Sequence, residues 1–235
     1  MKRLVGAIVL LFSVANVFGQ DVKGEVGGWF LMLNHYSINE KWRVGNELHI
    51  RRNDWVKEQE QFLIRPYVDY KINKNVILTA GYTYLNTKQI AQTPLPIAIP
   101  ENNVWEQLTL NQTYGKVKIS HRYRMEQRFV GIPEQNEEGD YEIDGVRQTN
   151  RLRYRLTVKR NISDVWFVHL FDEIWIHQDG LKPSSFDRNW LYAGLGINVM
   201  KDANIQLGYM HQWVRASEDA YINRPTVQLT IQYNI

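Results

Sequence analysis

The sequence contains no cysteine. Without that residue the mature protein can be neither a disulfide scaffold nor a lipoprotein attached through an amino-terminal cysteine, and no enzymatic mechanism can use a thiol. Beyond residue 19 the chain also lacks any uninterrupted apolar stretch of the ~20 residues that a transmembrane helix needs. If this chain enters a membrane, it does so as strands.

An excess of charge of either sign is also missing. The chain has 28 Lys and Arg against 25 Asp and Glu, and two of the basic residues lie in the leader, which leaves 26 against 25. A net charge near +1 gives no reason to expect nucleic acid as a partner. No linker, low-complexity tract or break in composition divides residues 20–235, so one domain is expected there.

The first nineteen residues are typical of a secretory signal peptide. A basic start at residues 1–3 precedes an apolar run over 4–17, which is shorter than the ~20 residues of a membrane anchor. Val17 and Gly19 fit the −3 and −1 sites of a signal peptidase, with Gln20 as the new amino terminus. We therefore expect residues 1–19 to be removed and residues 20–235 to be exported.

From residue 24 onward apolar and polar residues alternate in segments of about 10 to 14 residues. A strand of a membrane barrel needs ~9 to 11 residues, whereas strands of soluble sheets average about 5 to 6. The fold class predicted is therefore all-β, an antiparallel transmembrane β-barrel. The segments are 24–36, 42–52, 60–72, 75–86, 103–114, 116–129, 147–160, 164–177, 188–200, 204–215 and 225–235.

Eleven segments conflict with the even strand number of bacterial barrels. A short strand around Asp21 to Glu25 would give twelve, which we prefer, and leaving out segment 24–36 would give ten. The connections alternate between short turns and longer loops, as in outer-membrane barrels, where the short turns are periplasmic. The longer ones cover 87–102, 130–146, 178–187 and 216–224.

Individual strands show two distinct faces. In the final segment Val227, Leu229 and Ile231 alternate with Gln228 and Thr230, so an apolar stripe is expected to meet lipid and an uncharged polar stripe the lumen. Aromatic residues near strand ends are expected to form interfacial girdles. They are Trp42, Trp55, Tyr84, Trp105, Trp166, Trp175, Trp190 and Trp213.

The run His121 to Phe129 (HRYRMEQRF), followed by Arg151 to Arg155 (RLRYR), resembles the uncharacterised outer-membrane family named domain of unknown function 2490. The likeness extends over most of residues 20–235 and includes the opening hairpin from Trp29 to Arg52. The resemblance implies a barrel in the outer membrane of a Gram-negative bacterium and supplies no activity.

Two neighbouring segments carry a track of charged residues on one face. The track consists of Arg122, Arg124, Glu126 and Arg128 on the first segment and Arg151, Arg153 and Arg155 on the second. Guanidinium groups bind carboxylate and phosphate, so one interpretation is a narrow channel for small anionic solutes. The alternative is a structural network that fills a plugged barrel, in which these arginines pair with Glu126, Glu47, Asp69 or Glu173.

No arrangement of residues identifies an enzyme. Ser120 and His121 are adjacent, and alternation puts them on opposite faces of a strand. The six histidines show no metal-ligand spacing, and the acidic stretch 130–146 lacks the bidentate acid of a calcium loop. That stretch is expected to be a solvated loop or a flap over the arginine-lined mouth.

We therefore expect no catalytic residue, cofactor or metal. Besides the plugged barrel we keep three further alternatives to the channel: a lipid-modifying barrel enzyme, a lipid-carrying barrel and a soluble periplasmic sandwich. Expected partners are outer-membrane lipid and lipopolysaccharide, the barrel-assembly machinery and small anionic solutes.

Overall fold

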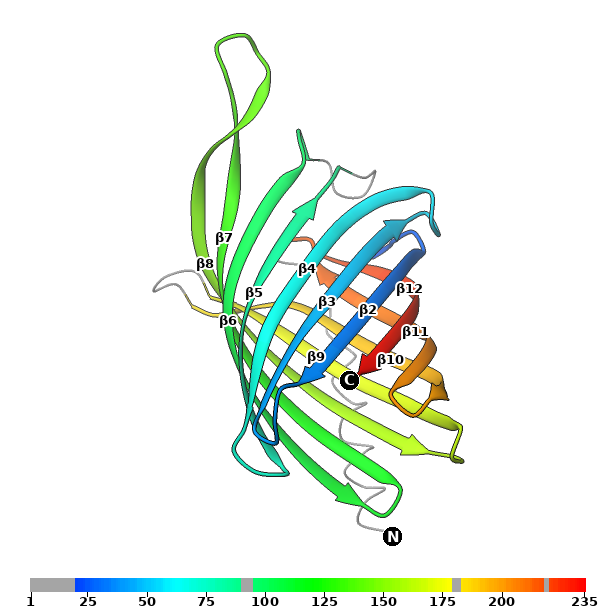
Figure 1. Cartoon of the computed structure of the whole chain (residues 1–235). Coiled ribbons are helices and arrows are strands. Elements are labelled where there is room, and N and C mark those ends of the chain that lie inside the picture. Colours follow the sequence, from blue (N-terminus) through cyan, green and yellow to red (C-terminus); the bar gives the residue numbers. More distant parts are fainter. Residues whose placement is uncertain (1–19, 90–94, 179–182, 218–219) are drawn as a thin grey trace.

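The computed structural model describes residues 20–89, 95–178, 183–217 and 220–235, and there it is a β-barrel (Figure 1). The expected signal peptide, residues 1–19, lies outside these ranges. The strands are β1 (Gln20–Lys23), β2 (Gly27–Ser37), β3 (Trp42–Asn53), β4 (Glu58–Lys71), β5 (Val76–Thr87), β6 (Ile99–Tyr114), β7 (Val117–Gln135), β8 (Tyr141–Asn161), β9 (Trp166–Gln178), β10 (Ser185–Met200), β11 (Ala203–Arg215) and β12 (Ala220–Asn234).

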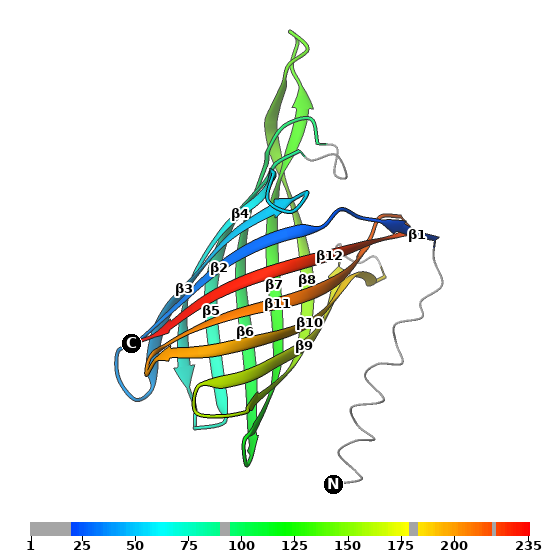
Figure 2. The same cartoon turned by 90° about the vertical axis from the view of Figure 1, so that its right-hand side faces the viewer.

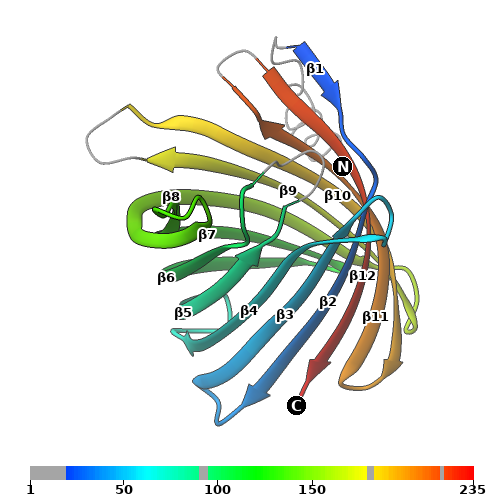
Figure 3. The same ribbon diagram turned by 90° about the horizontal axis from the view of Figure 1, so that it is seen from above.

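Consecutive strands from β2 to β12 pair antiparallel, and the sheet closes where β12 pairs with β2 in parallel (Figure 3). The closed barrel expected from the sequence is confirmed. β1 does not add a separate strand to the wall, because it also pairs with β12, end to end with β2. The wall thus holds eleven strands, between the ten and twelve considered. An odd number sends the first and last strands in the same direction, so their pairing must be parallel.

The two ends of the barrel differ in their connections. We call the turn end the one that carries Ile235 and the turns 38–41, 72–75, 115–116, 162–165 and 201–202, and the loop end the other (Figure 2). At the loop end β3 reverses into β4 through Asp54 and Trp55, both with positive φ (43° and 63°). The chain enters the barrel at the loop end through β1, so entry and exit lie at opposite ends.

The acidic stretch 130–146 is mainly a continuation of two strands. β7 extends to Gln135 and β8 begins at Tyr141, so only residues 136–140 form the turn. Figures 1 and 2 show this hairpin standing beyond the rim, in line with the barrel wall. The flap over the mouth, which is the alternative to a solvated loop, is therefore wrong. β7 and β8 stay paired with each other beyond Gly131 and Val146. This pairing extends the hairpin away from the barrel, so it does not bend across the opening.

Side chains alternate between a largely apolar outer face and a polar interior. On β12, Thr226 and Thr230 are buried while Val227 and Leu229 are exposed. On β7, Arg124 and Glu126 are buried while Tyr123 and Met125 are exposed. On both strands, the residues that the sequence alternation assigned to the interior and to the outer face are the ones found there. Separately, no helix among the described residues is long and apolar enough to span a membrane.

The expected girdle is only partly present. Trp42, Trp55 and Trp166 are exposed near strand ends. Trp105, Trp175 and Trp190 instead lie in the interior, at 1%, 3% and 4% exposure, so their assignment to a girdle is wrong. The small barrel leaves an interior that side chains fill, and aromatic rings occupy much of it.

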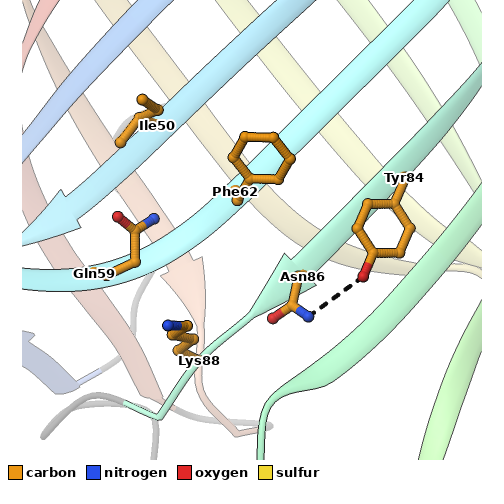
Figure 4. A pocket seen from close by; sticks show the side chains of 6 residues that line it. All are labelled: Ile50, Gln59, Phe62, Tyr84, Asn86 and Lys88. Carbon is orange, nitrogen blue, oxygen red and sulfur yellow. Dashed lines mark hydrogen bonds between the residues drawn. The ribbon is translucent and has the colours of Figure 1, made fainter.

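At the loop end, the outer wall of β3, β4 and β5 carries a shallow hollow of about 370 Å³ (Figure 4). Ile50, Phe62 and Tyr84 supply apolar surface, and Asn86 and Lys88 supply polar groups beside it. This mixture of aromatic and polar side chains suits a boundary between an apolar and an aqueous phase.

Candidate functional site: the charged lumen

Strand register brings the predicted track together. In the β7–β8 ladder Arg122 lies opposite Arg155, Arg124 opposite Arg153, and Glu126 opposite Arg151. Residues directly opposite each other project to the same face of a sheet, so these six side chains share the lumen wall. The two segments are thus neighbouring strands, which is the condition under which the sequence predicted a shared charged face.

Glu126 is the first centre of this network and is completely buried. Its Oε2 accepts hydrogen bonds from Arg151 Nε at 2.8 Å and Nη2 at 2.5 Å. Its Oε1 accepts one from Arg153 Nη1 at 2.5 Å, and Arg124 Nη1 lies 3.8 Å away. One carboxylate is thus surrounded by three guanidinium groups.

Glu173, on β9, is the second centre and is equally buried. Arg153 Nε donates to its Oε1 and Arg155 Nε to its Oε2, each at 2.8 Å, and Arg122 also donates to Oε1. Alternation alone could not orient Glu173, because β9 is apolar on both parities. Arg153 bridges the two centres, so the β7–β8–β9 wall carries one connected ionic network.

Further ion pairs line the rest of the interior. Arg128 donates both Nε and Nη2 to Glu101 at 2.7 Å, in a bidentate pair near the loop end. Arg224 donates to Glu60 at 2.7 and 2.8 Å, from β12 to β4. Other pairs join Arg65 to Glu47 at 2.5 Å, Arg43 to Asp69, and Arg151 to Asp187 at 3.7 Å. Of the acids expected as partners of the track, Glu47 and Asp69 bind these other arginines.

Exposure changes along the track. The side chains of Arg128 toward the loop end and Arg155 toward the turn end are 16% and 21% exposed, whereas those of Arg153 and Arg124 are only 3% and 2% exposed. The track is therefore most buried at its middle, which we call the waist, and less buried toward its two ends, which we call the vestibules. Arginines lie in all three.

Aromatic rings flank the guanidinium groups at the waist. Trp29, Trp175 and Trp190 belong to one buried cluster, with the Trp175 and Trp190 ring centroids 4.4 Å apart. Arg153 lies 3.7 Å from the Trp175 centroid and Arg51 lies 4.1 Å from that of Trp29. Cation–π contacts of this kind hold desolvated cations without neutralising their charge.

Several interior residues were not singled out from the sequence, among them Arg51, Arg65, Glu60, Glu101 and Asp187. The alternation in segment 42–52 could have placed some of them in the interior, since Glu47, His49 and Arg51 alternate with apolar residues there. Their ion-pair partners could not be predicted from parity, because a pair such as Arg224–Glu60 joins β12 to β4, two strands far apart in the chain.

The remaining sequence candidates lie away from this network. His121 is on the outer face, where Nδ1 and Tyr154 Oη share a hydrogen bond of 2.9 Å, and Ser120 is opposite Thr157. Within the described ranges, no group of three or more His, Cys, Asp or Glu side chains is placed to hold a metal ion.

Comparison with known proteins gives three findings. The family model described as "Protein of unknown function (DUF2490)" matches residues 26–223. An uncharacterised protein of Methylorubrum extorquens is 26% identical over 176 residues, which cover 72% of this chain and 70% of that protein. Among solved structures, the NanC porin is similar with a TM-score of 0.48 and 11% identity, covering 83% of this chain and 89% of that chain.

Proposed function

Because the chain belongs to this family of proteins of unknown function, whose description names no activity, we propose its function from the lumen: an outer-membrane β-barrel that passes small anionic solutes along its arginine track.

The placement in an outer membrane is supported by the two faces of the wall. Strands of 11 to 21 residues, from β2 to β12, present apolar side chains outward and charged ones inward. The signal-peptide pattern of residues 1–19 supports export. Outer-membrane lipid and lipopolysaccharide would contact the outer face, and the barrel-assembly machinery would insert the chain.

Anion passage is supported by one observation above all: the arginines form a continuous track that the neighbouring carboxylates do not neutralise. The six arginines of the track are within ion-pair reach of four carboxylates, Glu101, Glu126, Glu173 and Asp187. Asp187 is also paired with Arg188. Narrow pores lined by Arg and Lys favour anions, because the fixed charge lowers the electrostatic cost of entry.

The test combines folding and transport. Replacing Arg128 by Gln at the loop-end vestibule should lower anion preference in planar-bilayer recordings while the protein keeps its heat-modifiable gel migration, since Arg128 is partly exposed and its pair with Glu101 can be hydrated. Fractionation should recover the wild type with outer membranes. A protein found in the soluble periplasmic fraction would overturn the placement.

A plugged structural barrel is the second candidate, and the complete burial of Glu126 and Glu173 favours it. In that case the waist stays dry, and the ion pairs only hold the wall together. A correctly folded wild type that conducts no ions in planar bilayers would decide for this candidate.

A further inference from the structure

Two arginines at the waist differ from their neighbours, because each is hydrogen-bonded to a neutral amide. Arg51 Nη1 donates to Gln61 Oε1 at 2.7 Å. Arg124 donates Nε and Nη2 to Gln107 Oε1 at 2.9 and 2.8 Å. Within the described ranges no carboxylate forms an ion pair with Arg51, and the 3.8 Å approach of Arg124 to Glu126 includes no hydrogen bond.

The surroundings of these two arginines are also alike. Arg51 lies 4.1 Å from the ring centroid of Trp29, and Arg124 lies 3.9 Å from that of Trp105. Both residues are more than nine-tenths buried. Each keeps one buried nitrogen without a hydrogen-bond partner, Nε in Arg51 and Nη1 in Arg124. Arg65 and Arg153 act electrostatically on both, and each arginine also has one acid nearby that acts with the opposite sign, Glu60 for Arg51 and Glu47 for Arg124.

A buried guanidinium whose hydrogen-bond partner is neutral keeps an unbalanced positive charge, and that charge still attracts an anion. An oxyanion brings an opposite charge and can accept two parallel hydrogen bonds from one guanidinium, so it competes well with a neutral amide oxygen. It competes poorly with a carboxylate that is already paired, as in Arg153 with Glu126 and Glu173. The arginines of the waist therefore form two groups: those that keep their carboxylate partners, and those whose amide partners an anion can replace.

We propose that Arg51 and Arg124 are the anion-binding residues of the lumen, and that a small carboxylate or phosphate binds them by displacing Gln61 and Gln107. The inference rests on the proposed function, because the anion must enter the lumen. The Trp29 and Trp105 rings hold the two guanidinium groups in place while their partners exchange. The arginines bound to Glu126 and Glu173 serve to maintain the wall.

The experiment titrates the full barrel, folded in detergent, with malonate or with inorganic phosphate at constant ionic strength, and follows tryptophan fluorescence. The wild type should give a saturable change with either probe. R51Q and R124Q should each weaken binding by about tenfold or more, the size expected for one charged hydrogen bond. R51K and R124K should lose less, since the charge remains.

The sharper variants are Q61L and Q107L, which remove the competing amides and leave the arginines. Both should bind the probes more tightly than wild type, an effect that a purely structural role for the glutamines would not produce. R128Q and R155Q at the vestibules are matched controls, expected to change affinity less than threefold. Heat-modifiable migration establishes that each variant is folded.

The outcomes separate this inference from the proposed function. Loss of binding in R128Q and R155Q, with R51Q and R124Q unaffected, would overturn the waist site and leave anion passage standing. Binding that needs Arg51 and Arg124 in a wild type that does not conduct would support the site and overturn passage. A folded wild type with no saturable response to either probe would overturn the site.

Discussion

At the scale of single residues, the lumen depends on carboxylates that each serve several arginines. Glu126 contacts Arg124, Arg151 and Arg153, and Glu173 contacts Arg122, Arg153 and Arg155. Removing one partner of a buried pair leaves the others desolvated, which costs more than the pair itself contributes. These two glutamates are therefore the most sensitive ionic positions in the wall.

Glu126→Gln should destabilise the barrel by about 3 to 5 kcal/mol, because two buried arginines each lose a counter-charge: Arg151 keeps only Asp187 at 3.7 Å, and Arg153 keeps only Glu173. Glu101→Gln is the control, since its partner Arg128 is partly exposed and can be hydrated. Urea unfolding in detergent micelles measures both. Equal losses of unfolding free energy in the two variants would contradict the buried network.

Only glycine fits at position 81, because an aromatic neighbour occupies the space that a larger side chain would need. A Cβ built on it would overlap the indole of Trp105, which lies against the glycine and donates Nε1 to Thr83 Oγ1 at 3.0 Å. Gly81→Ala should therefore cost about 1 to 3 kcal/mol in unfolding free energy, as overpacking does. Gly115→Ala, with nothing within 4 Å of its Cβ but a φ of 58°, tests backbone strain alone. A fully stable Gly81→Ala variant would mean that Trp105 is packed elsewhere.

At the scale of the element, strand β12 separates the two environments residue by residue. Leu229→Arg places a cation on the outer face and should impair membrane insertion, at ~2 to 4 kcal/mol near the midplane. Gln232→Arg is the matched lumen change, chosen near the turn end because Thr230, further inside, is already packed at 3% exposure. The fraction with heat-modifiable migration reports assembly. Equal defects would contradict the assignment of the two faces.

The β7–β8 hairpin should be dispensable for folding. In the described ranges β6 pairs with β7 only as far as Val130, and β9 pairs with β8 only from Asn150, so the hairpin tip contacts no other strand in the ladder. Replacing residues 132–143 with a short Gly-containing turn should leave heat-modifiable migration unchanged. Failure to assemble would show that the hairpin is needed for folding.

The sequence predicted strand faces better than it predicted what fills the interior. Period-two alternation on β7 and β12 identified which side chains are buried, since parity alone decides that. It failed for Trp105, Trp175 and Trp190, because proximity to a strand end does not tell whether a ring points in or out. Arg51 and its neighbours were not singled out because the pairs around them join distant strands, which no local pattern records.

At the scale of the whole molecule, the parallel pairing of β2 with β12 closes the barrel and requires an odd number of strands in the wall. Phe30 lies opposite Leu229 across this closure, and Leu207 lies opposite Leu229 across the neighbouring β11–β12 ladder. Since the chain has no cysteine, a Phe30→Cys, Leu229→Cys pair can be oxidised without competing thiols. It should form a disulfide as readily as the Leu207→Cys, Leu229→Cys control. A bond in the control alone would contradict the eleven-stranded closure.

The reversal potential of the wild-type barrel, measured in a planar bilayer with a KCl gradient, shows whether the arginine track makes the lumen a path for anions. We expect a measurable conductance whose reversal potential lies toward the equilibrium potential of chloride. A folded protein that conducts nothing, or one whose reversal potential lies toward that of potassium, would contradict it.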